Sequence, residues 1–221
     1  MFYLNLHTHH PEMRSNVLAV RNFSPKQFLV NRSVGPDSDD APALVSMGIH
    51  PWNADEMVQA ELATMASLLQ DKQVAAVGEI GLDRCCDVDF ECQQMVFLAQ
   101  LKMAACVGLP VIVHCVKAWD ELLAMVRQVD NCPPLIIHGF RGKPELANQL
   151  MKWGFFLSFG TKFNEDTLRQ IPLSSLFLET DDNADADIVS LYRRVAEIKG
   201  VPLETLQDAM MRNARLLGFC R

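Results

Sequence analysis

Residues 110–140, PVIVHCVKAWDELLAMVRQVDNCPPLIIHGF, predict a buried strand, a helix and a second buried strand. The runs VIV and LII are apolar without interruption, as in strands that are buried on both faces of a parallel sheet. The helical pattern between them supplies the crossover that two neighbouring parallel strands require. Each strand also ends in a histidine, His114 in the first and His138 in the second.

The same alternation extends over most of the chain. Eight apolar runs are candidate strands, and they begin at Phe2, Asn16, Ala43, Val74, Pro110, Pro134, Phe155 and Leu176. Helical patterns follow the later runs, at Ala54–Gln70, Asp89–Val107, Ala118–Val129, Lys143–Trp153 and Asp185–Lys199, with a last helix from near Pro202. Strands that alternate with helices predict an α/β architecture with a parallel sheet.

The front of the chain departs from this alternation. Only residues 10–15 separate the first two candidate strands, fewer than a parallel crossover normally needs, so the second strand could run antiparallel. Residues 24–42 are rich in turn-forming residues and predict a loop with at most one helical turn. The first two helices are therefore expected to be shortened or missing. No linker or repeat divides the chain, and we expect one domain, residues 1–221.

Composition limits the class of protein. A hydrophobic content of 49% allows a large core, and no stretch reaches the roughly 20 apolar residues of a membrane span. The first residues also lack the features of a signal peptide, so we expect a cytoplasmic protein. The seven cysteines form no paired CxxC motif, which predicts reduced thiols. A net charge of −7 argues against tight nonspecific binding of nucleic acid, although a metal centre would supply local positive charge.

Histidines and acids gather where the candidate strands end. Because the carboxyl ends of barrel strands meet on one face, these side chains are expected on the face where active sites form. His7 and His9 are two residues apart, so on a strand both point to the same side and can bind one ion. The remaining members of the set are His50, Glu79, His114, His138 and Asp181.

Imidazole and carboxylate together suit a first-row dication better than calcium. The pattern predicts one or two divalent ions, with zinc, manganese or magnesium as candidates. In the two-ion arrangement Glu79 bridges, His7, His9 and Asp181 bind one ion, and His114 and His138 bind the other. Glu79 and Asp181 are the candidate catalytic residues, since Asp181 could also accept the proton of the attacking water.

The ordered motifs of this chain resemble the TatD family of metal-dependent hydrolases, as a short and divergent member. The resemblance spans nearly the whole chain and is carried by HTH at His7, GIHPW at Gly48, VGEIGLD at Val77, PVIVHC at Pro110, HGFRG at His138, ETD at Glu179 and RNARLLGF near the C-terminus. It implies a TIM-type (β/α) barrel of the amidohydrolase-like kind with one or two divalent ions. It also implies phosphoester cleavage, with 3′ exodeoxyribonuclease activity on single-stranded DNA ends as the specific form. The implied metal ligands are His7, His9, Glu79, His114, His138 and Asp181.

Three departures from the family pattern bear on the substrate. Asn5 stands where the family usually has aspartate, Val116 and Lys117 stand where it often has arginine, and the stretch after Asp181 is strongly acidic. His50, Lys117 and Arg141 are the candidate substrate-binding residues, because Lys117 or Arg141 could neutralise phosphate charge. A structural role for His50 in its turn, and ordinary solvated side chains for the two bases, remain open. The acidic stretch would repel a long polyanionic strand, but a role as N-terminal caps of the following helix explains Asp185 and Asp187 equally well.

Three functions are compatible with these residues. The first is a hydrolase acting on phosphoester bonds. The second is an amidohydrolase-like enzyme that acts on a small molecule with the same metal centre, and the negative net charge favours it slightly. The third is a barrel that retains metal without catalysis, against which the complete ligand set argues. No feature of the sequence indicates an obligate protein partner or a membrane.

Overall fold

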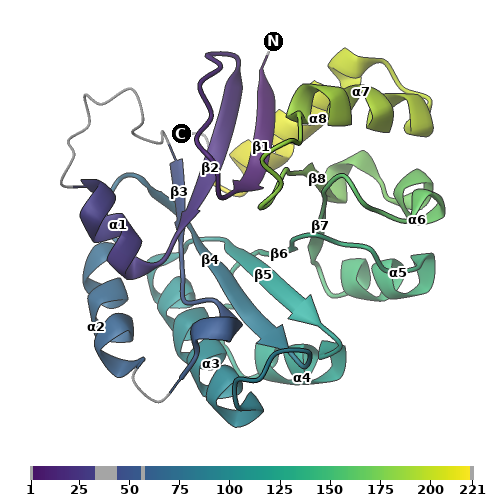
Figure 1. The fold of residues 1–221 in the computed structure, drawn as a ribbon. Coiled ribbons are helices and arrows are strands. Elements are labelled where there is room, and N and C mark those ends of the chain that lie inside the picture. Colours follow the sequence, from purple (N-terminus) through teal and green to yellow (C-terminus); the bar gives the residue numbers. More distant parts are fainter. Residues whose placement is uncertain (1, 33–43, 56–57, 220–221) are drawn as a thin grey trace. The chain divides into compact units, whose positions relative to one another are not determined.

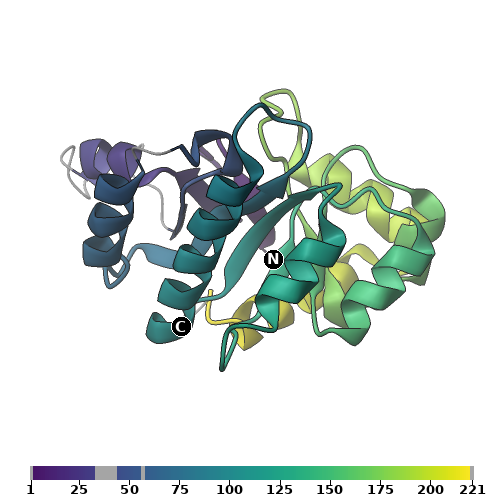
Figure 2. The ribbon, with the colours of Figure 1, turned by 90° about the horizontal axis from the view of Figure 1, so that it is seen from below.

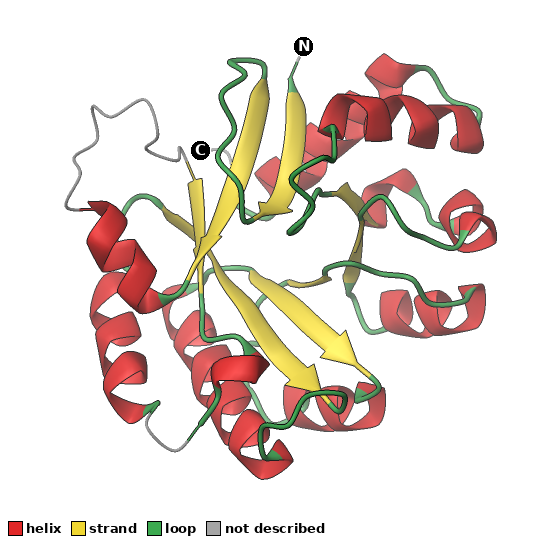
Figure 3. Ribbon diagram, viewed as in Figure 1, coloured by secondary structure: helices red, strands yellow, loops and turns green. Residues whose placement is uncertain are grey.

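The computed structural model describes residues 2–32, 44–55 and 58–219. Its eight strands form one sheet whose strand order follows the sequence from β1 to β8 (Figure 1). The strand pairs β1–β2, β3–β4, β4–β5, β6–β7 and β7–β8 are parallel. Helices connect most of the successive strands (Figure 3). This order is that of a TIM-type (β/α) barrel, which confirms the predicted fold class.

The strands match the eight apolar runs. They are β1 Tyr3–Thr8, β2 Val17–Phe23, β3 Leu44–Met47, β4 Val74–Asp83, β5 Val111–Val116, β6 Leu135–Ile137, β7 Phe156–Phe159 and β8 Leu176–Leu178. The α-helices are α1 Pro25–Arg32, α2 Gln59–Leu68, α3 Phe90–Val107, α4 Trp119–Val126, α5 Pro144–Lys152, α6 Glu165–Gln170, α7 Ile188–Lys199 and α8 Leu203–Leu216. Two 3₁₀ turns, η1 Pro51–Asn53 and η2 Leu173–Ser175, precede α2 and β8.

The chain forms two compact units. The first comprises Met1–Arg21, Pro42–Leu44 and Ile136–Arg221, and the second comprises Asn22–Ala41 and Val45–Leu135. The single domain expected from the sequence therefore stays a prediction.

The second unit is built around β4 and β5. Every residue of β4 is buried, which explains its uninterrupted apolar run. Gly81 of β4 pairs with His114 of β5, and a Cβ atom at Gly81 would collide with the carbonyl oxygen of His114. Glycine thus permits the close approach of the two strands. Helix α3 packs against β4 and α4 against β5, and the two helices are neighbours (Figure 2).

The long helix α3 has the ends that its sequence predicts. The side chain of Asp89 accepts a hydrogen bond from the backbone N–H of Cys92, as an N-cap does. Gly108 ends the helix in the left-handed conformation at φ 72°.

In the first unit, α7 and α8 pack against β1 and β8. The buried Tyr192 hydroxyl of α7 donates to the carbonyl of Leu4 at 3.0 Å and accepts from the backbone N–H of Leu4 at 3.1 Å. From α8, the Asn213 side chain donates to the carbonyls of Leu173 and Leu176 at 2.8 and 3.0 Å. These bonds fix the helices to β1 and to the start of β8, the strands that lead to the candidate site.

Three expectations about connections need correction. The second strand is parallel to β1, although only His9–Asn16 join them and no helix lies between. Helix α1 has eight residues, about two turns, where at most one turn was expected; residues 33–43 lie outside the described part of the chain. Helix α6 was not predicted, because six residues are too few to establish a helical period. The first helix is thus missing and the second is short.

No helix in the part of the chain that the structure describes has the length and apolar character needed to cross a membrane.

Candidate functional site

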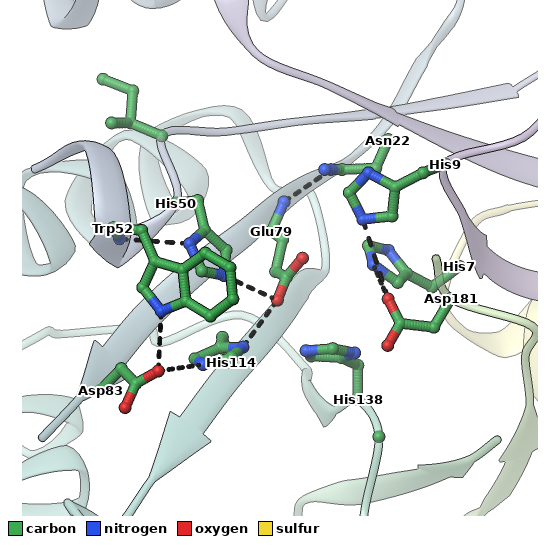
Figure 4. A network of polar contacts seen from close by, with 12 residues as sticks. His7, His9, Asn22, His50, Trp52, Glu79, Asp83, His114, His138 and Asp181 are labelled. Carbon is green, nitrogen blue, oxygen red and sulfur yellow. Dashed lines mark hydrogen bonds and ion pairs between the residues drawn. The ribbon is translucent and has the colours of Figure 1, made fainter. Parts of the chain in front are cut away.

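The first unit brings three predicted ligands together at strand ends (Figure 4). His7 lies on β1 and His9 directly after it, and Asp181 follows β8. Oδ1 of Asp181 lies 3.6 Å from Nε2 of His7 and 3.8 Å from Nε2 of His9. His7 is fully buried, whereas His9 and Asp181 are each about one third exposed. The cluster therefore has a buried side and a side open to solvent.

The spacing of these three groups fits a shared cation. Distances of 3.6 and 3.8 Å are too long for direct hydrogen bonds. Ligands about 2.0–2.2 Å from a zinc ion at tetrahedral angles lie roughly 3.3–3.6 Å from one another. Two imidazoles and a carboxylate at this separation form a donor set that suits a first-row dication.

Backbone contacts hold Asp181 beside the two histidines. Its N–H donates to the carbonyl of His7 at 3.0 Å, and its carbonyl accepts from the N–H of His9 at 3.1 Å. Asp181 adopts φ 54°, in the left-handed region that side chains other than glycine seldom enter. Such strain persists where surrounding bonds enforce it, and it is concentrated at functional sites.

His138 lies in the same unit, directly after β6, with its ring centroid 4.8 Å from that of His7. Its Nδ1 is 3.3 Å from Oε1 of Glu179, which also accepts the backbone N–H of Gly139 at 2.6 Å. Ligand atoms of His138, Glu179 and Asp181 lie within 4.8 Å of one another. Oε2 of Glu179 is buried and has no hydrogen-bond partner in the structure. A buried carboxylate oxygen without a partner is costly, and a cation would relieve that cost.

Glu179 is a site residue that sequence reasoning missed. It belongs to the ETD motif, of which only Asp181 was selected as a ligand. The sequence signal for Glu179 was an acidic residue directly after the apolar run that forms β8. In the structure its side chain is fully buried.

Asn5 acts through Thr180, the residue before Asp181. Its side-chain oxygen accepts the N–H of Thr180 at 3.0 Å, and its amide group donates to the Thr180 hydroxyl at 2.8 Å. An amide can donate and accept at once, whereas an ionised aspartate only accepts. The asparagine found at this position therefore links β1 to the segment that carries Asp181.

Replacing Asn5 with leucine is expected to lower the free energy of unfolding by about 1–3 kcal/mol, because a buried N–H loses its acceptor. Urea unfolding followed by circular dichroism measures the change. Asn148→Leu on the exposed surface of α5 is the matched control. Equal stability of the two variants would contradict this role of Asn5.

The second unit holds Glu79, His50 and His114 as a second cluster (Figure 4). Oε1 of Glu79 lies 2.7 Å from Nδ1 of His114 and 3.1 Å from Nε2 of His50. Glu79 is 4% exposed, and ligand atoms of the three residues lie within 4.8 Å of one another. The backbone N–H of Glu79 donates to Oδ1 of Asn22 at 2.7 Å. The sequence did not identify Asn22.

His50 donates a hydrogen bond to Glu79. The backbone N–H of Trp52 donates to Nδ1 of His50 at 3.1 Å, so this nitrogen carries no proton. The proton of the neutral ring is then on Nε2, which faces Glu79. The geometry makes His50 a residue that orients the carboxylate of Glu79.

Asp83 is a further site residue that sequence reasoning missed, although it ends the VGEIGLD motif. Its Oδ2 lies 3.1 Å from Nε2 of His114 and accepts the indole N–H of Trp52 at 2.8 Å. Burial opposes ionisation of Asp83, but hydrogen bonds from Trp52, the Cys85 N–H and His114 outweigh it and lower the pKa. An ionised Asp83 keeps the His114 proton on Nε2 and leaves Nδ1 available to an ion.

We therefore expect Asp83→Asn to weaken divalent-metal binding about 10- to 100-fold, the usual effect of losing such a carboxylate partner. Competition with a chromogenic chelator measures the affinity. Asp87→Asn, in the loop that follows β4, is the control. Unchanged affinity in Asp83→Asn would show that His114 does not depend on this carboxylate.

Two buried glutamines of α3 form hydrogen bonds with the backbone that carries the second cluster. Gln93 accepts from the N–H of Asp83 at 2.8 Å and donates to its carbonyl at 3.0 Å. Gln100 bonds in the same way to the N–H and carbonyl of Ile49, at 2.7 and 3.1 Å. Helix α3 thus fixes the backbone that carries Asp83 and the residue before His50.

Cys115, next to His114 on β5, is not among the residues whose ligand atoms gather in the two clusters. Burial raises the pKa of its thiol to about 12. Cys85, Cys86 and the other cysteines among the described residues form no disulfide.

The predicted bases occupy different places. Arg141 lines a cavity of about 350 Å³ together with Lys162 and the segment from Glu179 to Asn183. Lys162 was not identified from the sequence. Lys117 lies after β5 with an exposed side chain and φ 54°, and it does not line this cavity. The cavity combines these two cations with the carboxylates of Glu179, Asp181 and Asp182.

The acidic stretch after Asp181 has a structural role at its far end. Asp187 is the N-cap of α7, and its side chain accepts the N–H groups of Val189 and Ser190. It also pairs with Arg14 at 2.5 Å. These contacts, with that of Ser190 the largest, lower the pKa of Asp187 against the opposing effect of burial.

Asp187→Ala is expected to lower the free energy of unfolding by about 1 kcal/mol at neutral pH, the usual cost of losing an N-cap. Because the folded-state pKa is lowered, the stabilisation is present above the ordinary aspartate pKa of about 3.9 and is lost as the pH falls below it. Thermal unfolding of both proteins at pH 7 and pH 3 measures this. A difference that does not shrink at pH 3 would contradict the assignment.

The sequence matches the family model described as TatD related DNase over residues 33–217. A 3′-5′ ssDNA/RNA exonuclease TatD from Cronobacter sakazakii is 34% identical over 145 residues, which cover 61% of this chain and 55% of that protein. YjjV of Escherichia coli, named an uncharacterized metal-dependent hydrolase, is 27% identical over 198 residues, covering 80% of this chain and 76% of YjjV.

Solved structures confirm the fold. The crystal structure of YjjV aligns with a TM-score of 0.85 at 22% identity and covers 99% of this chain and 98% of that one. A dihydroorotase aligns with a TM-score of 0.71 at 14% identity, covering 97% of this chain and 68% of the dihydroorotase. With the family model matched over most of its length, the chain belongs to the TatD family of metal-dependent hydrolases.

Proposed function

We propose that this enzyme cleaves phosphoester bonds in a divalent-metal-dependent reaction, and that its substrate is the 3′ end of single-stranded DNA. The observation that carries the proposal is the spacing of His7, His9 and Asp181, which suits a shared cation. The substrate class is supported by the relative that is named a 3′-5′ ssDNA/RNA exonuclease.

The proposed ligands are His7, His9, His138 and Asp181 in the first unit and Glu79 and His114 in the second. Glu179 joins the first group, because its buried Oε2 has no hydrogen-bond partner in the structure. Zinc, manganese and magnesium are the candidate ions, one or two in number. The bridging role of Glu79 stays a prediction, and it requires that Glu79→Gln reduce binding of both ions.

Bound ions would lower the pKa of a water molecule and withdraw charge from the phosphate. The chain's own groups supply the remaining functions. Asp181 accepts the proton of the attacking water, and its fixed backbone keeps the carboxylate oriented for that step. Glu79, held by the Nε2 proton of His50, supplies the second catalytic carboxylate.

Basic side chains would neutralise the negative charge of the phosphate. Arg141 and Lys162 line the cavity that also contains Asp181, and Arg141 can contact two phosphate oxygens at once. Lys117 is proposed to contact substrate from its exposed position after β5. His50 contributes to substrate binding through Glu79, whose orientation it sets.

The enzyme is also proposed to be a cytoplasmic protein of one domain. The six cysteines of the described residues form no disulfide, which supports a reducing compartment and hence the cytoplasm. The single sheet that contains all eight strands supports one domain over residues 1–221. No obligate protein partner is proposed.

The test uses chelated protein reconstituted with manganese. Its substrates are single-stranded DNA of defined length labelled at the 5′ end, and a generic small phosphodiester. We expect a metal-dependent ladder of progressively shorter 5′-labelled products. If only the small ester is cut, phosphoester chemistry stands and the DNA substrate is wrong.

If neither substrate is cut, the proposed function is wrong. The amidohydrolase-like alternative would then be tested with cyclic amides in the same reconstituted protein.

A further inference from the structure

Trp52 has an unusual position beside the cluster of Glu79, His50 and His114. It lies in η1, between the buried Pro51 and the exposed Asn53, and its side chain is 59% exposed. Its neighbours Ile49, Ala54 and Val58 are buried in the hydrophobic cluster that packs against α3. This segment therefore buries its aliphatic residues and exposes the large aromatic side chain of Trp52 to solvent.

The exposed indole is held in one orientation. Its N–H donates to Oδ2 of Asp83 at 2.8 Å, and the backbone N–H of Trp52 donates to His50. The rings of His50 and His114 meet it edge-on, with centroids 4.7 and 6.2 Å away and interplanar angles of 79° and 75° (Figure 4). Holding the indole in one orientation costs conformational entropy. Because the ring is mostly exposed, burial in the core does not offset this cost.

The ring lies close to groups that the proposed reaction uses. Oδ2 of Asp83, which accepts the indole proton, also contacts His114, and His114 contacts Glu79. A planar group stacked on the indole would thus lie next to the bond-breaking residues of this unit. A rigid, exposed aromatic ring stacks on any nucleobase, because every base has a π-face.

We propose that Trp52 is a stacking platform for a planar aromatic group of the substrate, a nucleobase next to the bond that is cut. This inference rests on the proposed function and adds the base as an element of recognition. It predicts that the enzyme distinguishes nucleotides from sugar phosphates of the same charge. It also predicts little preference among the four bases.

Binding to the full chain is measured first, without turnover. Isothermal titration compares deoxyadenosine monophosphate with 2-deoxyribose 5-phosphate. We expect the nucleotide to bind about tenfold more tightly, as one stacked base provides. Equal affinities would overturn the proposal. Because no hydrolysis is involved, an inactive enzyme leaves this test intact, so its failure is separable from failure of the proposed function.

Variants then separate stacking from the hydrogen bond to Asp83. Trp52→Leu should lose the preference for the nucleotide, whereas Trp52→Phe keeps an aromatic ring without the N–H donor and should keep most of it. Trp153→Leu at the end of α5 is the control and should bind both compounds like the parent protein. If Trp52→Phe loses as much preference as Trp52→Leu, the indole serves only to hold Asp83, and the proposal is wrong. Should Trp52→Leu not fold, the two-ligand comparison on the parent protein still decides.

Discussion

Asp181→Asn is expected to reduce kcat for phosphodiester cleavage by about 10²- to 10⁴-fold, the range typical of losing a general base. The amide has nearly the same size as the carboxylate but cannot accept the proton of water at neutral pH. The backbone bonds of Asp181 to His7 and His9 do not involve its side chain, so the loop should keep its conformation. Steady-state hydrolysis at saturating metal measures the effect.

Asp182→Asn is the matched control for this change. Its side chain is 80% exposed and pairs only loosely with His10, at 3.4 Å. We expect that variant to retain activity within a few-fold of the parent. If the two variants lose activity equally, the effect comes from the acidic charge of the loop rather than from proton transfer by Asp181.

Loss of a ligand histidine is expected to remove metal without unfolding the chain. His114→Ala and His138→Ala should each lower the bound metal per chain, because each removes a nitrogen donor from its cluster. Residues at the carboxyl ends of barrel strands contribute to function more than to stability. Inductively coupled plasma mass spectrometry of dialysed protein measures the metal, and circular dichroism measures the fold.

Cys115→Ala is the control for the histidine variants, since it alters the neighbour of His114 without removing a donor. Unchanged metal content in both His114→Ala and His138→Ala would refute the assignment of these ligands. Loss of metal together with loss of the circular dichroism signal would indicate a structural metal, which is the noncatalytic alternative.

The strands and the histidines at their ends were predictable because their signals are local. His7, His114 and His138 each follow a short apolar run, and the run identifies both the strand and its end. The direction of β2 was not predictable, because it depends on pairing with β1 rather than on any pattern within β2. The helix caps Asp89 and Asp187 lie between these cases, since residue type allows a cap but packing decides it.

The residues that support the ligands could not be predicted in the same way. Glu179 contacts His138 across 41 positions of sequence, and Asp83 contacts His114 across 31. Gln93 appears in the sequence as an ordinary helical residue, and only its burial against Asp83 gives it a role. Asn5 departs from the family pattern, and its two bonds to Thr180 supply a physical reason for an amide.

The charge of the chain, −7, does not conflict with a nucleic-acid substrate. Arg141 and Lys162 line this cavity together with Glu179, Asp181 and Asp182, and bound divalent ions would offset the acidic excess there. The acidic Asp187 is neutralised by its contacts with Arg14 and with the start of α7. Of the other acidic residues in this stretch, Asp182 lines the cavity and Asp185 follows it, and both are exposed.

Metal-dependent hydrolysis is tested most directly by measuring bound metal and cleavage rate in the same preparation. Chelated protein is titrated with manganese, and cleavage of single-stranded DNA is followed at each ratio of metal to protein. We predict no cleavage by the metal-free protein and a rate that rises with bound metal to a plateau at one or two ions per chain. Cleavage by metal-free protein at an undiminished rate would contradict a metal-dependent hydrolase at these residues.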